Sequence, residues 1–157
     1  MLSAELAALF ARDIARLIQE LRAFPDTASL WKTTPGVTNA AGTLALHLEG
    51  NLREYIGRQL GGVAYTRQRP LEFGTRGVEQ AELMARLEAV KELVARVVSG
   101  LSSEQLDATY PELVLGNPMT TRQFLVHLEG HLNYHLGQVD YLRRFVTANG
   151  AIELAQL

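Results

Sequence analysis

The chain has 157 residues, of which 47% are hydrophobic and 20% are charged, a composition that is typical of folded globular proteins and excludes a disordered chain. The net charge of −2, with lysine and arginine spread along the sequence, offers no field for a phosphate backbone and excludes nucleic acid as an expected partner. Cysteine is absent, which excludes disulfides, thiolate metal ligands and a cysteine nucleophile.

The length predicts one domain, residues 1–157. Charged residues interrupt the N-terminal stretch from Leu2 to Leu21, and no run of about eighteen apolar residues follows elsewhere. We therefore expect no signal peptide, no membrane span and a cytoplasmic location.

Two helices are predicted in the first half of the chain. The first starts at Ser3 as its N-cap, places apolar residues at three- and four-residue steps, and ends before Pro25. The second runs from about Asn39 to Leu60, where Gly61-Gly62 supplies a stop. Residues 61–77 then form a connection that is longer than most in compact domains, which indicates a segment that crosses the bundle or covers a site.

Two further helices are predicted in the second half, at about residues 78–101 and from Thr121 to about Val146. Thr120 and Gln123 match a capping box at the start of the last helix. No convincing strand alternation competes with this pattern, so the expected fold class is all-α, most simply a four-helix bundle.

The second and fourth predicted helices share the pattern His-Leu-Glu-Gly-x-Leu, and each carries two glycines seven residues apart. These are Gly50 and Gly57 in one helix and Gly130 and Gly137 in the other. A glycine inside a helix costs about 1 kcal/mol relative to alanine. We expect another helix to approach these faces closely, either within the bundle or from a second subunit, although tolerated weak helix formers are the alternative.

All four histidines lie in these two segments. His131 and His135 are four residues apart, so on a helix they share one face about 5–6 Å from each other and can hold one divalent metal ion. His127 and His135 are two turns apart, about 12 Å along the axis, so one ion cannot bind all three histidines of this helix. The preferred metal ligands are therefore His47, His131 and His135, with buried polar packing or a histidine-lined surface as alternatives.

Residues near the histidines are candidates for the rest of the site. Asn51 and Tyr55 share the side of the helix that carries His47, and His127 lies one turn before His131, so these three are expected in the pocket or behind the ligands. The connection offers four charged residues that could hold a carboxylate-bearing substrate, or could only be solvated: Arg67, Arg69, Glu72 and Arg76. Glu49 and Glu129 point about 200° away from their histidines, which indicates surface or interface positions.

The chain resembles the DinB-like superfamily, a group of four-helix proteins that includes relatives of bacillithiol- and mycothiol-dependent transferases. The resemblance rests on His47, on His131-Leu-Asn-Tyr-His135-Leu-Gly-Gln138 and on the segment Arg69-Pro-Leu-Glu-Phe-Gly-Thr-Arg-Gly77. It implies an up-down-down-up bundle with a long crossover between helices two and three, often dimeric. It also implies a zinc or nickel ion held by His47, His131 and His135, with His127 not a ligand.

Three neutral histidines leave a metal ion with open positions, which is typical of catalytic rather than structural sites. The leading hypothesis is a metal-dependent enzyme for a small-molecule substrate, either a transferase of low-molecular-weight thiols or a hydrolase, with iron and manganese as further metals that histidine suits. Any thiolate must arrive with a cosubstrate because the chain has no cysteine. The alternatives are a non-catalytic binding bundle with a structural or absent metal, and a helical assembly protein.

Overall fold

The computed structural model describes residues 1–153 and is all-helical, which confirms the predicted fold class. Its elements in chain order are α1 (Leu2–Arg22), α2 (Thr27–Leu30), α3 (Ala41–Leu52), the π-helix η1 (Arg53–Arg58), α4 (Arg69–Gly74), α5 (Gln80–Ser99), α6 (Ser103–Asp107) and α7 (Thr121–Thr147). Within these residues β-pairing is limited to two isolated bridges. None of the helices described has the length and apolar character that crossing a membrane requires.

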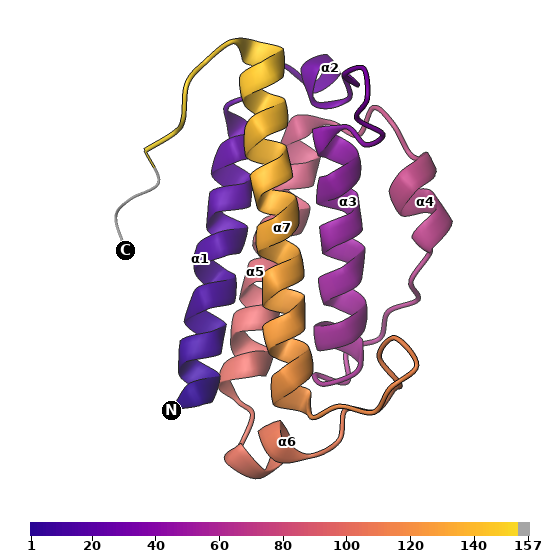
Figure 1. Cartoon of the computed structure of the whole chain (residues 1–157), viewed down its shortest axis with the longest axis vertical. Coiled ribbons are helices and arrows are strands. Elements are labelled where there is room, and N and C mark those ends of the chain that lie inside the picture. The colour runs from indigo at the N-terminus through magenta and orange to yellow at the C-terminus, as the bar shows by residue number, and fades with distance from the viewer. Residues whose placement is uncertain (154–157) are drawn as a thin grey trace.

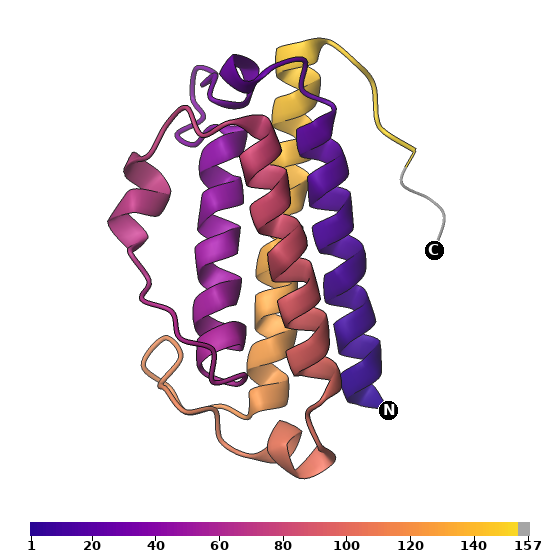
Figure 2. The same cartoon turned by 180° about the vertical axis from the view of Figure 1, so that it is seen from behind.

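The four long helices α1, α3, α5 and α7 lie side by side (Figures 1 and 2). α1 packs against α5 and α7, and α3 packs against the same two helices. Apolar side chains at three- and four-residue steps meet between them and form one core, because this spacing puts them on one face of each helix. Its fully buried members include Phe10, Ile14, Leu17, Leu48, Ile56, Val90, Leu125 and Leu132.

The helix ends agree with the sequence at some boundaries and not at others. Thr120 and Gln123 form the expected capping box at the start of α7. The N-cap prediction for the first helix is wrong, because α1 begins at Leu2 with Met1 as its N-cap and Ser3 is buried inside the first turn. The second predicted helix is α-helical only to Leu52 and continues as the π-helix η1.

The connection between α3 and α5 lies along the outside of α3 (Figure 1). It starts where Gly62, at a φ of +64°, takes the left-handed conformation that suits glycine, and it contains α4. α4 packs on α3 and covers the side that the long helices leave open. Every residue of α3 from Ala41 to Leu52 is consequently buried, including the polar residues His47, Glu49 and Asn51.

The four helix glycines divide into two kinds. A Cβ atom added to Gly50 would lie 2.2 Å from Oε1 of Glu72, and one added to Gly57 would lie 2.8 Å from Cδ2 of Leu93. Other elements therefore do approach the glycines of the second predicted helix closely, although at Gly50 the neighbour is a glutamate side chain of α4. Around Gly130 and Gly137 a Cβ would meet no atom within 4 Å among the described residues.

Candidate metal centre

Three imidazole rings converge between α3 and α7. His47 is 6% exposed on α3, and His131 and His135 are half-buried on successive turns of α7. The Nε2 atom of His131 lies 3.2 Å from Nε2 of His47 and 3.1 Å from Nε2 of His135. The rings stand nearly perpendicular to one another, at interplanar angles between 84° and 89°. Edges rather than faces therefore meet at the common point.

This convergence fits a divalent metal ion. One nitrogen atom from each of His47, His131 and His135 lies within 4.8 Å of the others, which makes the three residues a group that could hold an ion. Tetrahedral zinc with Zn–N bonds of about 2.0–2.1 Å places its nitrogen ligands about 3.3 Å apart, close to the separations found here. The two separations from Nε2 of His131 thus match those of a zinc site, and the third separation is within 4.8 Å.

The outer ring nitrogens are held differently in the three histidines. Nδ1 of His47 lies 2.9 Å from Oε2 of Glu72, and Nδ1 of His135 lies 2.7 Å from Oε1 of Gln138. Because both partners are acceptors, these Nδ1 atoms donate, and the Nε2 atoms keep lone pairs that point inward. Nδ1 of His131 is buried and has no hydrogen-bond partner among the described residues.

The charges around the centre favour metal binding. Burial, together with the imidazoles of His135 and His47, lowers the pKa of His131 to about 4. Burial also lowers the pKa of His47, although the hydrogen bond to Glu72 opposes this. Burial alone would raise the pKa of Glu72, but hydrogen bonds from Arg67 and His47 outweigh it and lower the pKa. At neutral pH these groups are therefore two neutral imidazoles and a carboxylate, the forms that a metal site requires.

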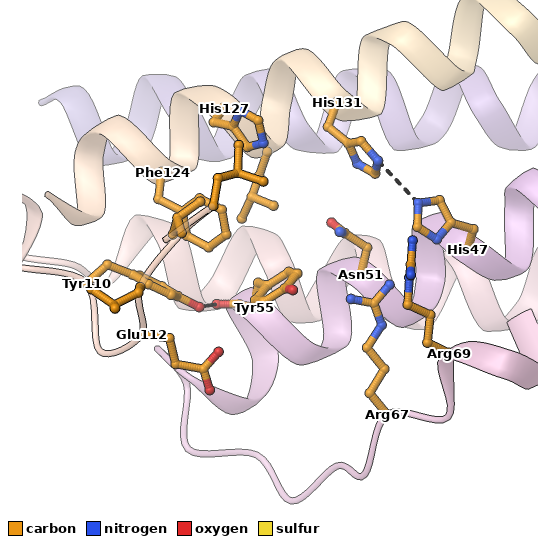
Figure 3. Close-up of a pocket in the computed structure, with 14 residues that line it drawn as sticks. His47, Asn51, Tyr55, Arg67, Arg69, Tyr110, Glu112, Phe124, His127 and His131 are labelled. Atoms are coloured by element: carbon orange, nitrogen blue, oxygen red, sulfur yellow. Dashed lines mark hydrogen bonds between the residues drawn. The ribbon is translucent and has the colours of Figure 1, made fainter. Parts of the chain in front are cut away.

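A cavity of about 360 Å³ opens beside His47 and His131 (Figure 3). Its polar end carries the two histidines with Asn51, Arg67 and Arg69. Its other end mixes apolar and aromatic side chains with two polar ones, and η1, α7 and the segment that precedes α7 supply the lining residues Tyr55, Tyr110, Glu112, Leu113, Val114, Leu115, Phe124, His127 and Leu128. Such a cavity has the size and mixed polarity of a small-molecule site.

The three arginines that the sequence nominates are separated by the fold. Arg67 lines the cavity, but Glu72 binds its guanidinium through two contacts of 2.7 and 2.9 Å. Arg69 also lines the cavity and is exposed, with its guanidinium over the ring of Phe73. Arg76 donates to the backbone carbonyls of Phe73 and Thr75 and is not among the residues that line the cavity. Of the three, Arg69 is the cation best placed for an anionic ligand.

The remaining candidates lie as follows. Asn51, Tyr55 and His127 all line the cavity, and His127 is exposed with its ring stacked on Phe124 at 6.0 Å. Of the surface and interface positions predicted for Glu49, the surface position is wrong, because this side chain is buried and accepts hydrogen bonds from Arg53 and Arg86. α4 covers it, which helical periodicity alone does not predict.

Sequence reasoning missed other groups of the site. Gln138 follows His135 by three residues, a helical spacing that could have indicated the hydrogen bond. The sequence places Glu72 only among the charged residues of the connection, because its contact with His47 depends on how the connection docks. Tyr110, whose hydroxyl donates to the carbonyl of Tyr55 at 2.8 Å, gave no signal in the sequence.

Comparisons with known proteins agree with this architecture. A crystal structure of a conserved protein from Enterococcus faecalis is 20% identical with a TM-score of 0.73, covering 94% of this chain and 96% of that one. A DinB-like protein from Bacillus cereus ATCC 10987 is 18% identical with a TM-score of 0.67, covering 89% of this chain and 91% of that one. A search of curated proteins gave no match. Because the profile of the DinB superfamily matches residues 9–139, the chain belongs to that superfamily.

Proposed function

We propose that the protein is a metal-dependent enzyme that acts on a small molecule. The observation that carries the proposal is the convergence of three Nε2 atoms at one end of a cavity that is large enough for a substrate. A purely structural ion is usually enclosed by four protein ligands, whereas three histidines beside a cavity leave coordination positions for water or substrate. The arrangement thus supports a catalytic rather than a structural ion.

The chemistry divides between the ion and the side chains. A bound divalent ion would act as a Lewis acid, polarising a substrate oxygen or lowering the pKa of a coordinated water or thiol. His47, His131 and His135 would hold it through Nε2, while Glu72 and Gln138 fix the rings of His47 and His135. The rings of Tyr55, Tyr110 and Phe124 would exclude water from the part of the substrate that they contact, as apolar cavity walls do.

Two reaction classes fit this site: transfer of a low-molecular-weight thiol and hydrolysis. The thiol reaction agrees with the absence of cysteine, since the sulfur would arrive with a cosubstrate. Zinc or nickel is the proposed metal because imidazole suits both, and iron and manganese are the alternatives.

We further propose that the substrate carries an anionic group that Arg69 binds, with Arg67 beside it. Arg69→Gln should raise KM about tenfold with a smaller change in kcat, because the lost contact binds substrate and transition state alike. Arg76→Gln is the matched control, since Arg76 lies outside the cavity lining. Equal KM values in the two variants would contradict the role of Arg69.

The test begins with protein purified without a histidine tag. Metal content is measured by elemental analysis for the wild type and for His131→Ala. The metal-free protein is then loaded with zinc, nickel, iron or manganese, and each form is assayed with an activated ester and with a thiol plus an aryl halide. We expect turnover that a chelator abolishes and that His131→Ala lacks.

The outcomes separate the candidate functions. Unchanged metal content in His131→Ala would refute the proposed site. A wild-type protein that binds metal but turns over no substrate, while a ligand still raises its melting temperature, would favour the non-catalytic binding bundle.

Finer features of the fold and assembly belong to the same proposal. The chain ascends α1 and α7 in Figure 1 and descends α3 and α5, which supports an up-down-down-up bundle with residues 61–79 as the crossover. The homodimer and the cytoplasmic location stay predictions. Light scattering after size exclusion would measure the mass of the assembly, and cell fractionation would establish the location.

A further inference from the structure

Glu72 is a buried carboxylate that contacts a ligand histidine from a distant part of the chain. It is 6% exposed and belongs to α4, twenty-five positions after His47. Its Oε2 atom accepts from Nδ1 of His47 at 2.9 Å, and both of its oxygens accept from Arg67. Burying a carboxylate is costly unless it is paired and hydrogen-bonded, and here both conditions are met.

The contact with His47 fixes the ring as a metal ligand needs. Donation from Nδ1 selects the tautomer whose Nε2 lone pair faces His131. The ring of Phe73, the next residue of α4, lies 4.9 Å from the ring of His47 at 37°. α4 therefore fixes both the tautomer and the tilt of this imidazole.

Gly50 makes this approach possible. The residue lies one turn after His47 on α3, directly beneath the carboxylate of Glu72. A Cβ atom there would come within 2.2 Å of Oε1 and 2.7 Å of Cδ of Glu72. Because the same carboxylate is bound by Arg67 and His47, it cannot move aside without losing one of these partners.

We propose that Glu72 is a positioning residue for the metal centre and that Gly50 is a glycine because Glu72 must reach His47 over it. The crossover is then part of the metal site, although it supplies no ligand. The inference rests on the proposed metal site and adds to it the residues that set its affinity. It also explains why one glycine of the repeated His-Leu-Glu-Gly pattern is required and the other is not.

Glu72→Gln is the first test, measured as the affinity for zinc in competition with a chelating dye. We expect an affinity about 10–100-fold below that of the wild type, the usual loss when an outer partner of a ligand histidine is changed. Glu49→Gln is the matched control, because Glu49 is as buried as Glu72 and is likewise paired with arginine, through Arg53 and Arg86, but contacts no ligand. Equal affinities in the wild type and Glu72→Gln, or an equal loss in both variants, would overturn the proposal.

Gly50→Ala is the second test, with Gly130→Ala as its control at the matching position of the repeat. We expect the first variant to lose zinc affinity and the second to retain it, since a Cβ at Gly130 meets no neighbour. The double variant Gly50→Ala with Glu72→Gln should have a zinc affinity no lower than that of the single variant with the lower affinity, because both changes act through one carboxylate. Additive losses would contradict this common route.

A third measurement needs no metal and separates this proposal from the proposed function. In the metal-free wild type at neutral pH, the ring nitrogen shifts of His47 in nuclear magnetic resonance should report a proton on Nδ1. A proton on Nε2 would refute the role of Glu72. A wild type that binds no metal ion but carries the Nδ1 proton would refute the proposed function and keep the His47–Glu72 contact.

Discussion

Two helices of this protein contain the same four-residue sequence, but its residues have different surroundings in each. In α3 the pattern is His47-Leu-Glu49-Gly50, and in α7 it is His127-Leu-Glu129-Gly130. His47 is buried against two other imidazoles, whereas His127 is exposed on the cavity wall. Gly50 lies beneath a carboxylate, whereas Gly130 has no close neighbour. Identical local sequence thus acquires its role from the elements that pack on it.

The difference comes from the crossover. α4 covers the outer side of α3, so all three polar or small positions of that segment are enclosed. No described helix covers the corresponding side of α7, where residues 126, 127, 130 and 134 are exposed. A repeat in sequence is therefore a reliable guide to helix formation here and a poor guide to chemistry.

The largest expected effect separates the two histidines of the repeat. His47→Ala should reduce bound metal to the background level, because it removes one of three converging nitrogens. His127→Ala should leave metal content at the wild-type value, since this ring lies outside the converging group. Elemental analysis of both proteins measures this directly. Equal loss in the two variants would mean that the repeat is functionally symmetric.

Glutamine substitutions at Glu49 and Glu129 should change the free energy of unfolding in opposite directions. Glu49→Gln weakens hydrogen bonds from Arg53 and Arg86 and should lower the free energy of unfolding by about 1–3 kcal/mol, the range for hydrogen bonds to charged groups. Glu129 instead lies beside the carboxylate of Asp13, and burial, with this neighbour, raises its pKa from 4.5 to about 7. Glu129→Gln should therefore stabilise the protein at pH 8, because an amide resembles the protonated acid.

The pH dependence sharpens the same contrast. Since the folded-state pKa of Glu129 is raised, its favourable contribution is present below pH 4.5 and is lost as the pH rises through about 7. Asp13 has its pKa lowered to about 2, so its contribution is lost only toward acid, outside this window. Denaturant titrations between pH 5 and 8 should show that the stability of the wild type falls relative to that of Glu129→Gln, because the lowered pKa values of His47 and His131 act equally in both proteins. Parallel profiles would exclude the shifted carboxyl.

The smallest effect concerns the two glycines of α7. Gly130→Ala and Gly137→Ala should each raise the free energy of unfolding by up to about 1 kcal/mol, the helix propensity difference. Gly57→Ala should do the opposite, because Leu93 fills the space beside it. A loss of stability in Gly130→Ala, together with a smaller mass in solution, would show that a second copy covers α7.

Much of the fold follows from local periodicity. The four long helices, the capping box at Thr120 and the pairing of His131 with His135 depend on residues within a few turns of each other, so the sequence predicts them. The position of His47 beside α7 is predicted only by the matching repeat and the family resemblance. Metal binding by these histidines stays a prediction until the ion is measured.

Other features depend on contacts that no local pattern contains. The π-helix η1 arises where α3 continues past Leu52, in a segment whose poorest helix former is Gly57. The burial of Glu49 and the contact between Glu72 and His47 both follow from the docking of α4. The second contact has a separation of 25 residues in the chain, which helical periodicity cannot span.

The complete burial of α3 also bears on how freely this sequence can vary. A typical surface helix has a solvent face on which most substitutions are neutral, whereas α3 has buried residues at every position from Ala41 to Leu52. Mutational tolerance should therefore be low along all twelve residues of α3, with no helical period, whereas in α7 tolerant and intolerant positions should alternate with the period of the helix. Because α3 is enclosed on all sides, its sequence should change least among the helices of this protein.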